Sequence, residues 1–473
     1  MNGGTSIRKF IKTSGVFFIG TVLSKAISIL LLPLYTSRIP TSDMGYYDLS
    51  LTYITIVTSI LFFDIWVAIL RYMYDGEDVE SKATYICSGA RIFYLSSALY
   101  LIVGVGISVF VDISGVGWII AYGLTHNITN IFTFSARGYG RNVEFALSGI
   151  ISTFVNVLSN IVFILCFSMG YQALYLSSIL GCICQIAFLS WKTEIIHALF
   201  HGTVSREITR SMFKYSLPLC INSVSYWLLT SFNRIIINWV YGNSANGIYA
   251  VGNKFAFVIS LATTCFTYAW QDLAFSSANK LKEPGRFYSD ACNLYSKVLV
   301  MCMTIMLPCI KIFFPLLVNE SYADAASTVP LFLINAIVAA ISTFIGNVFY
   351  AIKDTKMIFY SMLASALLNL AIGYPLIKLL GLNGANIAVI SSFVLNIFIR
   401  NLILKKRISF VLDKNLLWLV GLILLSYFVY DNYGIGINLI MLAVSVVMSL
   451  LLFRQYIPMI IGFLKRRKDR HTT

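Results

Sequence analysis

The sequence predicts an all-α polytopic membrane protein with about 14 transmembrane helices. Three observations predict this class: the mean hydropathy is +0.80, only 12% of the 473 residues are charged, and apolar residues gather in long runs. A soluble globular domain carries about 25% charged residues, whereas a helix needs roughly 20 mostly apolar residues to cross the hydrocarbon core. Runs of that length lie near residues 14–36, 46–70, 85–111, 117–136, 146–168, 172–191, 215–241, 248–271, 296–318, 327–350, 357–377, 383–403, 415–431 and 435–457.

Basic residues lie almost entirely in alternate connections between the expected spans. Most of the 35 lysines and arginines fall on the side of the two termini, and only Arg38 and Lys378 fall in the opposite set. Cytoplasmic loops carry an excess of Lys and Arg, so the pattern predicts an even number of spans with both termini in the cytoplasm. The net charge of +15 then reflects topology and contact with anionic lipid, and we expect no nucleic-acid partner.

Neither the cysteines nor the acidic residues predict a metal centre or an active site. The nine cysteines form no CxxC pair, and most lie in or beside expected spans, where cysteine is a small buried hydrophobe. Acidic residues in the outer connections are few and scattered, which argues against a membrane enzyme with paired carboxylates. No P-loop motif is present, so we expect neither a metal, a cofactor nor the direct use of ATP.

The first six expected spans and the next six share a sequence pattern. Because six is an even number, both copies enter from the same side, and we expect a parallel repeat with its pseudo-twofold axis along the membrane normal. At two fixed offsets, the matching residues are Lys12, Ser14, Gly45 and Tyr47 with Lys214, Ser216, Gly247 and Tyr249, and Ser148, Ser152 and Asn156 with Ser361, Ser365 and Asn369. The predicted divisions are a first lobe, a linker, a second lobe, and two added helices with a basic tail, at residues 1–192, 193–214, 215–403 and 404–473.

Two stretches carry a resemblance to a known family. They comprise Thr21–Lys25, Pro33–Tyr35, Arg38–Pro40 and Gly45–Tyr47, and then Asn233–Ile237, Gly247–Val251 and Lys254. They resemble the polysaccharide-biosynthesis branch of the multidrug/oligosaccharidyl-lipid/polysaccharide exporter superfamily, and most of all its Wzx-type O-antigen and capsule-unit flippases. Many members carry an acidic residue where this chain has Asn233. The resemblance implies two six-helix lobes in a V around a central cavity, here with two further C-terminal helices.

The resemblance also implies a function and partners. Such flippases move undecaprenyl-diphosphate-linked oligosaccharide repeat units from the cytoplasmic to the outer leaflet of the bacterial inner membrane, by alternating access. We therefore expect a transport protein and not an enzyme, acting in O-antigen, capsule, lipopolysaccharide or exopolysaccharide synthesis. Its expected partners are the lipid-linked glycan and membrane lipids, with a polysaccharide polymerase and a chain-length regulator as further candidates.

Two alternatives stay open within this superfamily. One is a related flippase for teichuronic acid or a peptidoglycan precursor, which the sequence does not separate from the first. The other is a cation-coupled drug or metabolite antiporter, which would favour carboxylates in the cavity. The charge inside the expected spans is mainly positive, and this favours an anionic substrate.

Lys25 is the first candidate for binding a diphosphate. It lies roughly 16 Å into its helix, near the bilayer centre, where a lysine costs about 2.5–3.5 kcal/mol on insertion scales. Thr21 and Ser28 share its side of the helix, which predicts a polar stripe facing a wet cavity. The alternative is a lysine bonded to carbonyls or a carboxylate between packed helices.

Three further cations complete the expected cavity. Arg234 and Lys254 lie in the outer third of their spans, where snorkelling to the interface is the alternative. Lys311 lies between Pro308 and Pro315, which can kink its helix.

Uncharged polar residues predict contacts to sugar hydroxyls. Asn222, Tyr226 and Asn233 follow one face of the seventh expected span, and Asn156 and Asn369 are equivalent positions of the two copies. The alternative for all of them is close packing of membrane helices through small polar side chains.

Asp64 is the deepest carboxylate within the expected spans. It is therefore the candidate for coupling transport to H⁺ or Na⁺. The alternative is a structural ion pair with Arg91 on the following span.

Overall fold

The computed structural model describes residues 30–76, 78–110, 114–257, 284–352, 354–413 and 417–454, together with residues 259, 260, 263, 266 and 270. Every regular element in these ranges is helical, which confirms the predicted all-α class. The α-helices are α2 Leu32–Arg38, α3 Thr41–Phe62, α4 Ile65–Met73, α5 Val79–Phe110, α6 Val116–Gly138, α7 Asn142–Leu165, α8 Tyr171–Lys192, α9 Ile195–His201, α10 Arg206–Thr230, α11 Asn233–Phe255, α13 Pro284–Leu317, α14 Ala325–Ala351, α15 Thr355–Leu380, α16 Leu382–Ile408, α17 Leu417–Asn432 and α18 Ile435–Leu452.

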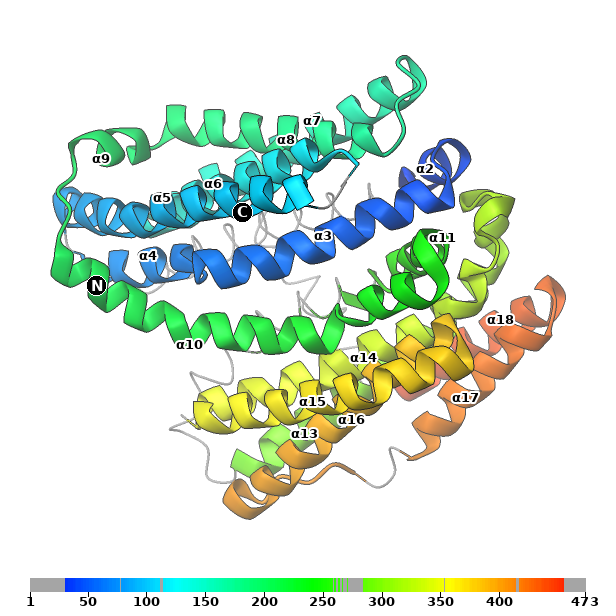
Figure 1. Ribbon diagram of the computed structural model, residues 1–473. Coiled ribbons are helices and arrows are strands. Elements are labelled where there is room, and N and C mark those ends of the chain that lie inside the picture. The colour runs from blue at the N-terminus through cyan, green and yellow to red at the C-terminus, as the bar shows by residue number, and fades with distance from the viewer. Residues whose placement is uncertain are drawn as a thin grey trace, which may run out of the picture.

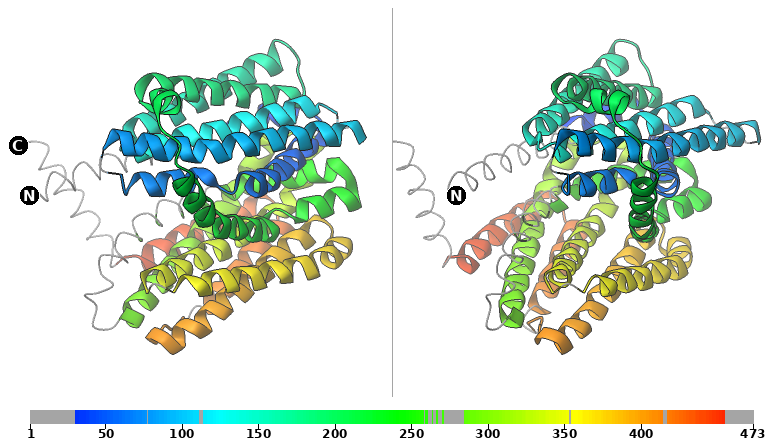
Figure 2. Two further views of the ribbon diagram at one scale, coloured as in Figure 1. Left: turned by 60° about the vertical axis from the view of Figure 1, so that its left-hand side comes forward. Right: turned by 90° about the vertical axis from the view of Figure 1, so that its left-hand side faces the viewer.

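Two groups of helices lie on either side of a central layer. Helices α5–α9 form one group and α13–α18 the other, while α3, α4, α10 and α11 run between them (Figure 1). The two groups are also separate in views turned by 60° and 90° (Figure 2). We call the end that carries Arg71, Lys82, Arg141 and Lys192 the basic end, and α9 lies there.

Most described helices have the length and composition of membrane spans. Within the described ranges, eight helices are long and apolar enough to cross a membrane, and the pair α3–α4, bent by 53°, makes a ninth. The bend falls at Phe63 and Asp64, which both have a positive φ. The chain is therefore a multi-pass membrane protein, although the first expected span lies mostly outside the described residues.

The span expected at 215–241 contains a break that the sequence did not predict. Helix α10 ends at Thr230 and α11 begins at Asn233, while Gly242 interrupts α11 where the span was expected to end. The apolar residues that follow Asn233 hid the break, because average hydropathy does not register a short polar interruption. Asn233 and Arg234 therefore belong to α11 and not to α10.

The two copies of the sequence repeat share a kink built from different residues. In the first copy, α2 ends at Arg38 and the extended Pro40 leads into α3. At the same offset in the second copy, Gly242 interrupts α11 with φ 80° and ψ −178°. Proline cannot continue a helix, and glycine adopts a positive φ without a steric penalty, so both residues turn the chain at the same place.

Candidate functional site

The two copies meet where α3 crosses α11, at the end of the molecule opposite the basic end (Figure 1). Among the described helices this pair makes the most extensive contact. A Cβ atom on Gly45 would overlap the carbonyl oxygen of Asn243 and lie 2.7 Å from the nitrogen of Gly247. A Cβ on Gly247 would overlap the carbonyl oxygen of Thr41 and lie 3.0 Å from the nitrogen of Gly45. Only glycine at both positions lets the two backbones touch.

This crossing is reciprocal, as in the interface of a twofold dimer. Gly45 meets Asn243, and Gly247 meets Thr41. The offset that relates Gly45 to Gly247 also relates Thr41 to Asn243, so the two contacts are equivalent. A twofold axis produces this exchange of contacts. Asn246 adds a hydrogen bond from its Nδ2 to the carbonyl oxygen of Gly45 at 2.9 Å. The crossing therefore holds the two copies together at this end.

An ion pair joins the same two helices. Arg234 Nε of α11 lies 2.7 Å from Asp48 Oδ2 of α3, and the two side chains are only 15% and 21% exposed. Lys254 lies further along α11, and its Nζ is 5.0 Å from the centre of the Tyr35 ring. Arg234 is thus paired with a carboxylate, and Lys254 lies beside an aromatic ring. Their role in substrate binding stays a prediction, as does that of Lys25, which lies with Thr21 and Ser28 outside the described residues.

Asp48 is the residue of this cluster that the sequence interpretation missed. It lies three residues after Gly45, inside an expected span. A carboxylate within a span is a functional signal by itself. Because the spans of the second copy contain several cations, the sequence could have predicted an ion pair between the two copies. Its repeat equivalent is Ala250, so the ion pair has no counterpart across the pseudo-twofold axis.

Lys311 contacts one of the two added C-terminal helices. Its Nζ donates to the carbonyl oxygen of Tyr430 at 2.8 Å and lies 4.9 Å from the centre of the Tyr430 ring. Tyr430 belongs to the last turn of α17, where carbonyl groups have no partner within the helix and a cation is favoured. The contact holds α17 against α13. A substrate role for Lys311 stays a prediction.

Replacing Lys311 by methionine tests which role dominates. We expect Lys311→Met to lower the free energy of unfolding by about 2 kcal/mol, because a charged donor is lost and a helix-end carbonyl is left unpaired, while transport is kept. The measurement is denaturant unfolding in micelles beside a transport assay. Lys378→Met, at an exposed lysine of α15, is the matched control. Loss of transport at unchanged stability would contradict the structural role.

Asn233 and Asn369 form a buried amide pair. Each Nδ2 donates to the Oδ1 of the other at 3.2 Å, and both side chains are almost fully buried. Asn369 Nδ2 also donates to the carbonyl oxygen of Leu228 at 2.9 Å. In the other group, Asn156 donates to Ser178 Oγ at 3.1 Å between α7 and α8. All three amides lie between packed helices, and a contact with sugar stays a prediction for them.

Helix α10 has both packed and accessible side chains. Trp227 packs on α3 and α4, and its Nε1 donates to the carbonyl oxygen of Thr52 at 3.0 Å. The accessible side chains form an apolar face with Leu217 and Ile221 and a polar face with Asn222 and Tyr226. One turn beyond Tyr226 on the same side of the helix, Leu229 packs on α15 and α16 in a cluster with Ala366, Val389 and Phe393.

The polar face of α10 is the accessible polar surface on which predicted cavity residues lie. Tyr226 is half exposed, and polar groups at membrane depth are expected to face the bundle interior or a water-filled space. A role of this face in a transport path stays a prediction. Asn222 and Tyr226 are thus the predicted cavity residues that the described structure leaves accessible together.

Asp64 lies at the break between α3 and α4. Its Oδ2 accepts a hydrogen bond from the Ser223 hydroxyl of α10 at 2.6 Å. The alternative pairing with Arg91 does not form among the described residues, whose ion pairs lie elsewhere. Asp64 thus connects the bend to α10, and its role in ion coupling stays a prediction.

Arg400 is a second residue whose environment the sequence did not reveal. The charge pattern placed it with a basic connection, but it is 2% exposed inside α16. Its Nε donates to Ser361 Oγ at 2.9 Å and its Nη1 to the Ser342 carbonyl oxygen at 2.7 Å. The guanidinium group therefore joins α14, α15 and α16.

Comparisons with known proteins agree with this geometry. The family model of "Polysaccharide biosynthesis protein" matches residues 10–270. The solved structure of the lipid II flippase MurJ in an inward closed conformation is similar with a TM-score of 0.67 at 14% identity, covering 93% of this chain and 99% of that one. An inward-facing multidrug resistance MATE family transporter of the MOP superfamily gives 0.65 at 14% identity, covering 83% and 94%. An outward-facing MATE transporter gives 0.56 at 15% identity, covering 84% and 95%.

No curated protein sequence matches this chain. The family match nevertheless covers more than half of the chain, and the similar structures share its two-group helical architecture. The family part of the resemblance stated from the sequence is thereby confirmed. The chain belongs to the polysaccharide biosynthesis protein family.

Proposed function

We propose that this protein is a flippase for undecaprenyl-diphosphate-linked oligosaccharide repeat units. The observation that carries the proposal is the polar face of α10, a helix that contacts both groups and leaves the uncharged side chains of Asn222 and Tyr226 accessible. Family membership and the fold shared with a lipid II flippase support a lipid-linked glycan as the substrate class. The glycan then serves O-antigen, capsule or exopolysaccharide synthesis.

In this proposal the two chemical parts of the headgroup meet different surfaces. Sugar hydroxyls exchange their water for the amide of Asn222 and the hydroxyl of Tyr226. The diphosphate exchanges its water for Lys25 and Arg234. The prenyl chain stays in lipid, because moving it through a polar space would expose apolar surface to water.

Arg234 links substrate binding to opening. In the described state it is paired with Asp48 across the α3–α11 contact. A diphosphate carries more negative charge than one carboxylate and accepts bidentate hydrogen bonds from a guanidinium group. When the diphosphate binds Arg234 in place of Asp48, the α3–α11 contact loses an ion pair. Opening at this end, toward the outer leaflet, then becomes easier. This is alternating access between two repeats, triggered by the substrate.

The setting follows from the same proposal. The basic end faces the cytoplasm, so both termini are cytoplasmic and the membrane is a bacterial inner membrane. Asp64, held by Ser223, is the site at which H⁺ or Na⁺ would act on the bend of α3–α4. A polysaccharide polymerase and a chain-length regulator would receive the flipped units.

The test is flipping by the purified protein in liposomes. A fluorescent prenyl-diphosphate oligosaccharide is placed in one leaflet, and its appearance in the other is followed with and without a proton or sodium gradient. We expect flipping at least about tenfold above protein-free liposomes. Transport of a small cation without any flipping of a matched glycan would contradict the proposal and favour the antiporter.

Tyr226 provides a residue-level test on the same assay. We expect Tyr226→Ala to lower flipping about tenfold, because one or two hydrogen bonds to sugar, each about 1 kcal/mol, are lost. Ile221→Ala, on the apolar face of α10, is the matched control and should leave the rate within twofold. Equal effects of both substitutions would show that α10 acts only through packing.

A further inference from the structure

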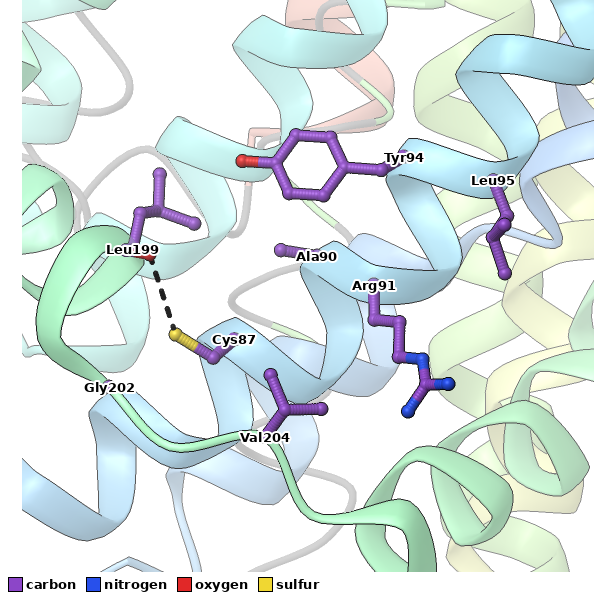
Figure 3. A pocket seen from close by; sticks show the side chains of 8 residues that line it. All are labelled: Cys87, Ala90, Arg91, Tyr94, Leu95, Leu199, Gly202 and Val204. Atoms are coloured by element: carbon purple, nitrogen blue, oxygen red, sulfur yellow. Dashed lines mark hydrogen bonds between the residues drawn. The ribbon is translucent and has the colours of Figure 1, made fainter.

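A cavity of about 370 Å³ lies at the basic end, between α5 and the connection from α9 to α10. Figure 3 shows its lining, in which Arg91 and Tyr94 project from neighbouring turns of α5 and Val204 lies on the connection. The lining residues are Cys87, Ala90, Arg91, Tyr94, Leu95, Leu199, Gly202 and Val204. Apart from the guanidinium group, the tyrosine hydroxyl and the thiol, these side chains are apolar.

Helix α9 and the connection after it are fixed to about one turn of α5 by three contacts. Thr203 Oγ1 lies 3.0 Å from Thr84 Oγ1, the Ser205 amide donates to Ser88 Oγ at 3.2 Å, and the Cys87 thiol donates to the Ala198 carbonyl oxygen at 2.9 Å (Figure 3 draws a longer thiol contact, to Leu199). A Cβ on Gly202 would lie 2.6 Å from Cys87 Sγ. The pocket is therefore already formed without a ligand, as is usual for binding sites.

Arg91 supplies a positive charge to this pocket. It is exposed, and within the described part of the chain no carboxylate pairs with it, since Asp64 accepts from Ser223 instead. A guanidinium group has five donors in a planar fork that matches the oxygens of a phosphate. An exposed arginine beside an apolar hollow is therefore complementary to a phosphate that carries apolar chains.

The surroundings place Arg91 at the level of lipid headgroups. Leu95, Ile102, Val105 and Val109 continue from it along one side of α5, and each is more than half exposed. At helical spacing this makes a continuous apolar stripe. At the same end, Trp191 is 76% exposed and Lys192 Nζ lies 3.6 Å from the centre of its ring. Aromatic and basic residues of this kind mark the interface of a membrane.

We infer that this pocket binds a glycerophospholipid with an anionic headgroup, from the leaflet at the basic end. Arg91 holds the phosphate, the Tyr94 hydroxyl reaches the headgroup region, and one acyl chain lies along the stripe from Leu95 to Val109. The site lies on the outer side of α5, so it does not depend on the proposed flipping. Its occupancy would add to the contacts that already hold the connection between the two copies against α5.

The test is a titration of the purified full chain with dioleoyl phosphatidylglycerol, followed by native mass spectrometry. Arg91→Gln is expected to raise the half-saturating lipid concentration about tenfold, and Leu95→Asn to raise it several-fold. Arg91→Lys, which keeps a charge, should retain most of the binding. Arg141→Gln removes an exposed arginine at the same end and should change binding less than twofold.

Three results would overturn the inference. Equal lipid binding by the wild type and Arg91→Gln would remove the site. An equal loss of lipid binding in Arg141→Gln would show that binding depends on the general surface charge and not on this pocket. Competition by glycerol phosphate, which has no acyl chain, at the same concentration as the lipid would identify a site for free phosphate. Comparison of melting temperatures establishes that each variant is folded before its binding is compared.

Discussion

Gly45→Val is expected to abolish transport of the lipid-linked glycan, because the crossing of α3 and α11 can no longer form. The added side chain would meet backbone atoms of Asn243 and Gly247, which cannot rotate away as a flexible side chain would. Overpacking costs about 1–3 kcal/mol, and rigid backbone neighbours place this substitution at the upper end. About 3 kcal/mol shifts the equilibrium between the state with the α3–α11 contact and the state without it by roughly a hundredfold.

The shift is measurable as a distance at the opposite end of the molecule. Spin labels at Arg141→Cys, which immediately precedes α7, and at Lys406→Cys on α16, in a background without native cysteines, report the separation of the two groups at the basic end. We expect a shorter distance in Gly45→Val than in the unsubstituted background. Gly149→Val is the control, because nothing lies within 4 Å of a Cβ at that glycine of α7. Normal transport by Gly45→Val would show that the α3–α11 contact has no part in the cycle.

Breaking the ion pair between Asp48 and Arg234 is expected to have the second largest effect. Asp48→Asn or Arg234→Gln alone leaves one charge largely buried without a partner, and breaking a buried pair costs about 3 kcal/mol or more. The double substitution Asp48→Asn/Arg234→Gln removes both charges, so its stability should be closer to that of the wild type than the sum of the two single effects. Denaturant unfolding of the four proteins gives this coupling energy.

Flipping by the same four proteins separates the two roles of Arg234. If Arg234 also binds the diphosphate, the double variant regains stability but stays at least about tenfold slower in flipping. Full recovery of flipping in the double variant would limit Arg234 to the ion pair with Asp48. Strictly additive losses of stability would mean that the 2.7 Å contact contributes nothing to the fold.

The positions of most helices can be predicted from the hydropathy of the sequence. Spans such as α5, α13 and α14 are long apolar runs, and each helix ends within a residue of its expected limit. Helix α14 also begins close to its expected start, whereas α5 and α13 begin earlier, at Val79 and Pro284. The break at Thr230 was not predictable in this way, because the apolar residues after Asn233 resemble a continued span. The residue partners of the cations were not predictable either: Arg234 meets Asp48, and Lys311 meets a carbonyl oxygen of α17.

The sequence by itself determined the class of protein, the repeat, and the side on which the basic connections lie, because lipid demands apolar helices of fixed length and translocation sorts charge. It also contained the offset that relates Gly45 to Gly247. Only the tertiary structure decided that these glycines touch, that Asp48 pairs with Arg234, and that Asn233 and Asn369 bond to each other while Tyr226 stays accessible. The reason is physical: a polar residue in a span must find a partner or water, and which of the two it finds depends on helices that are far apart in the chain.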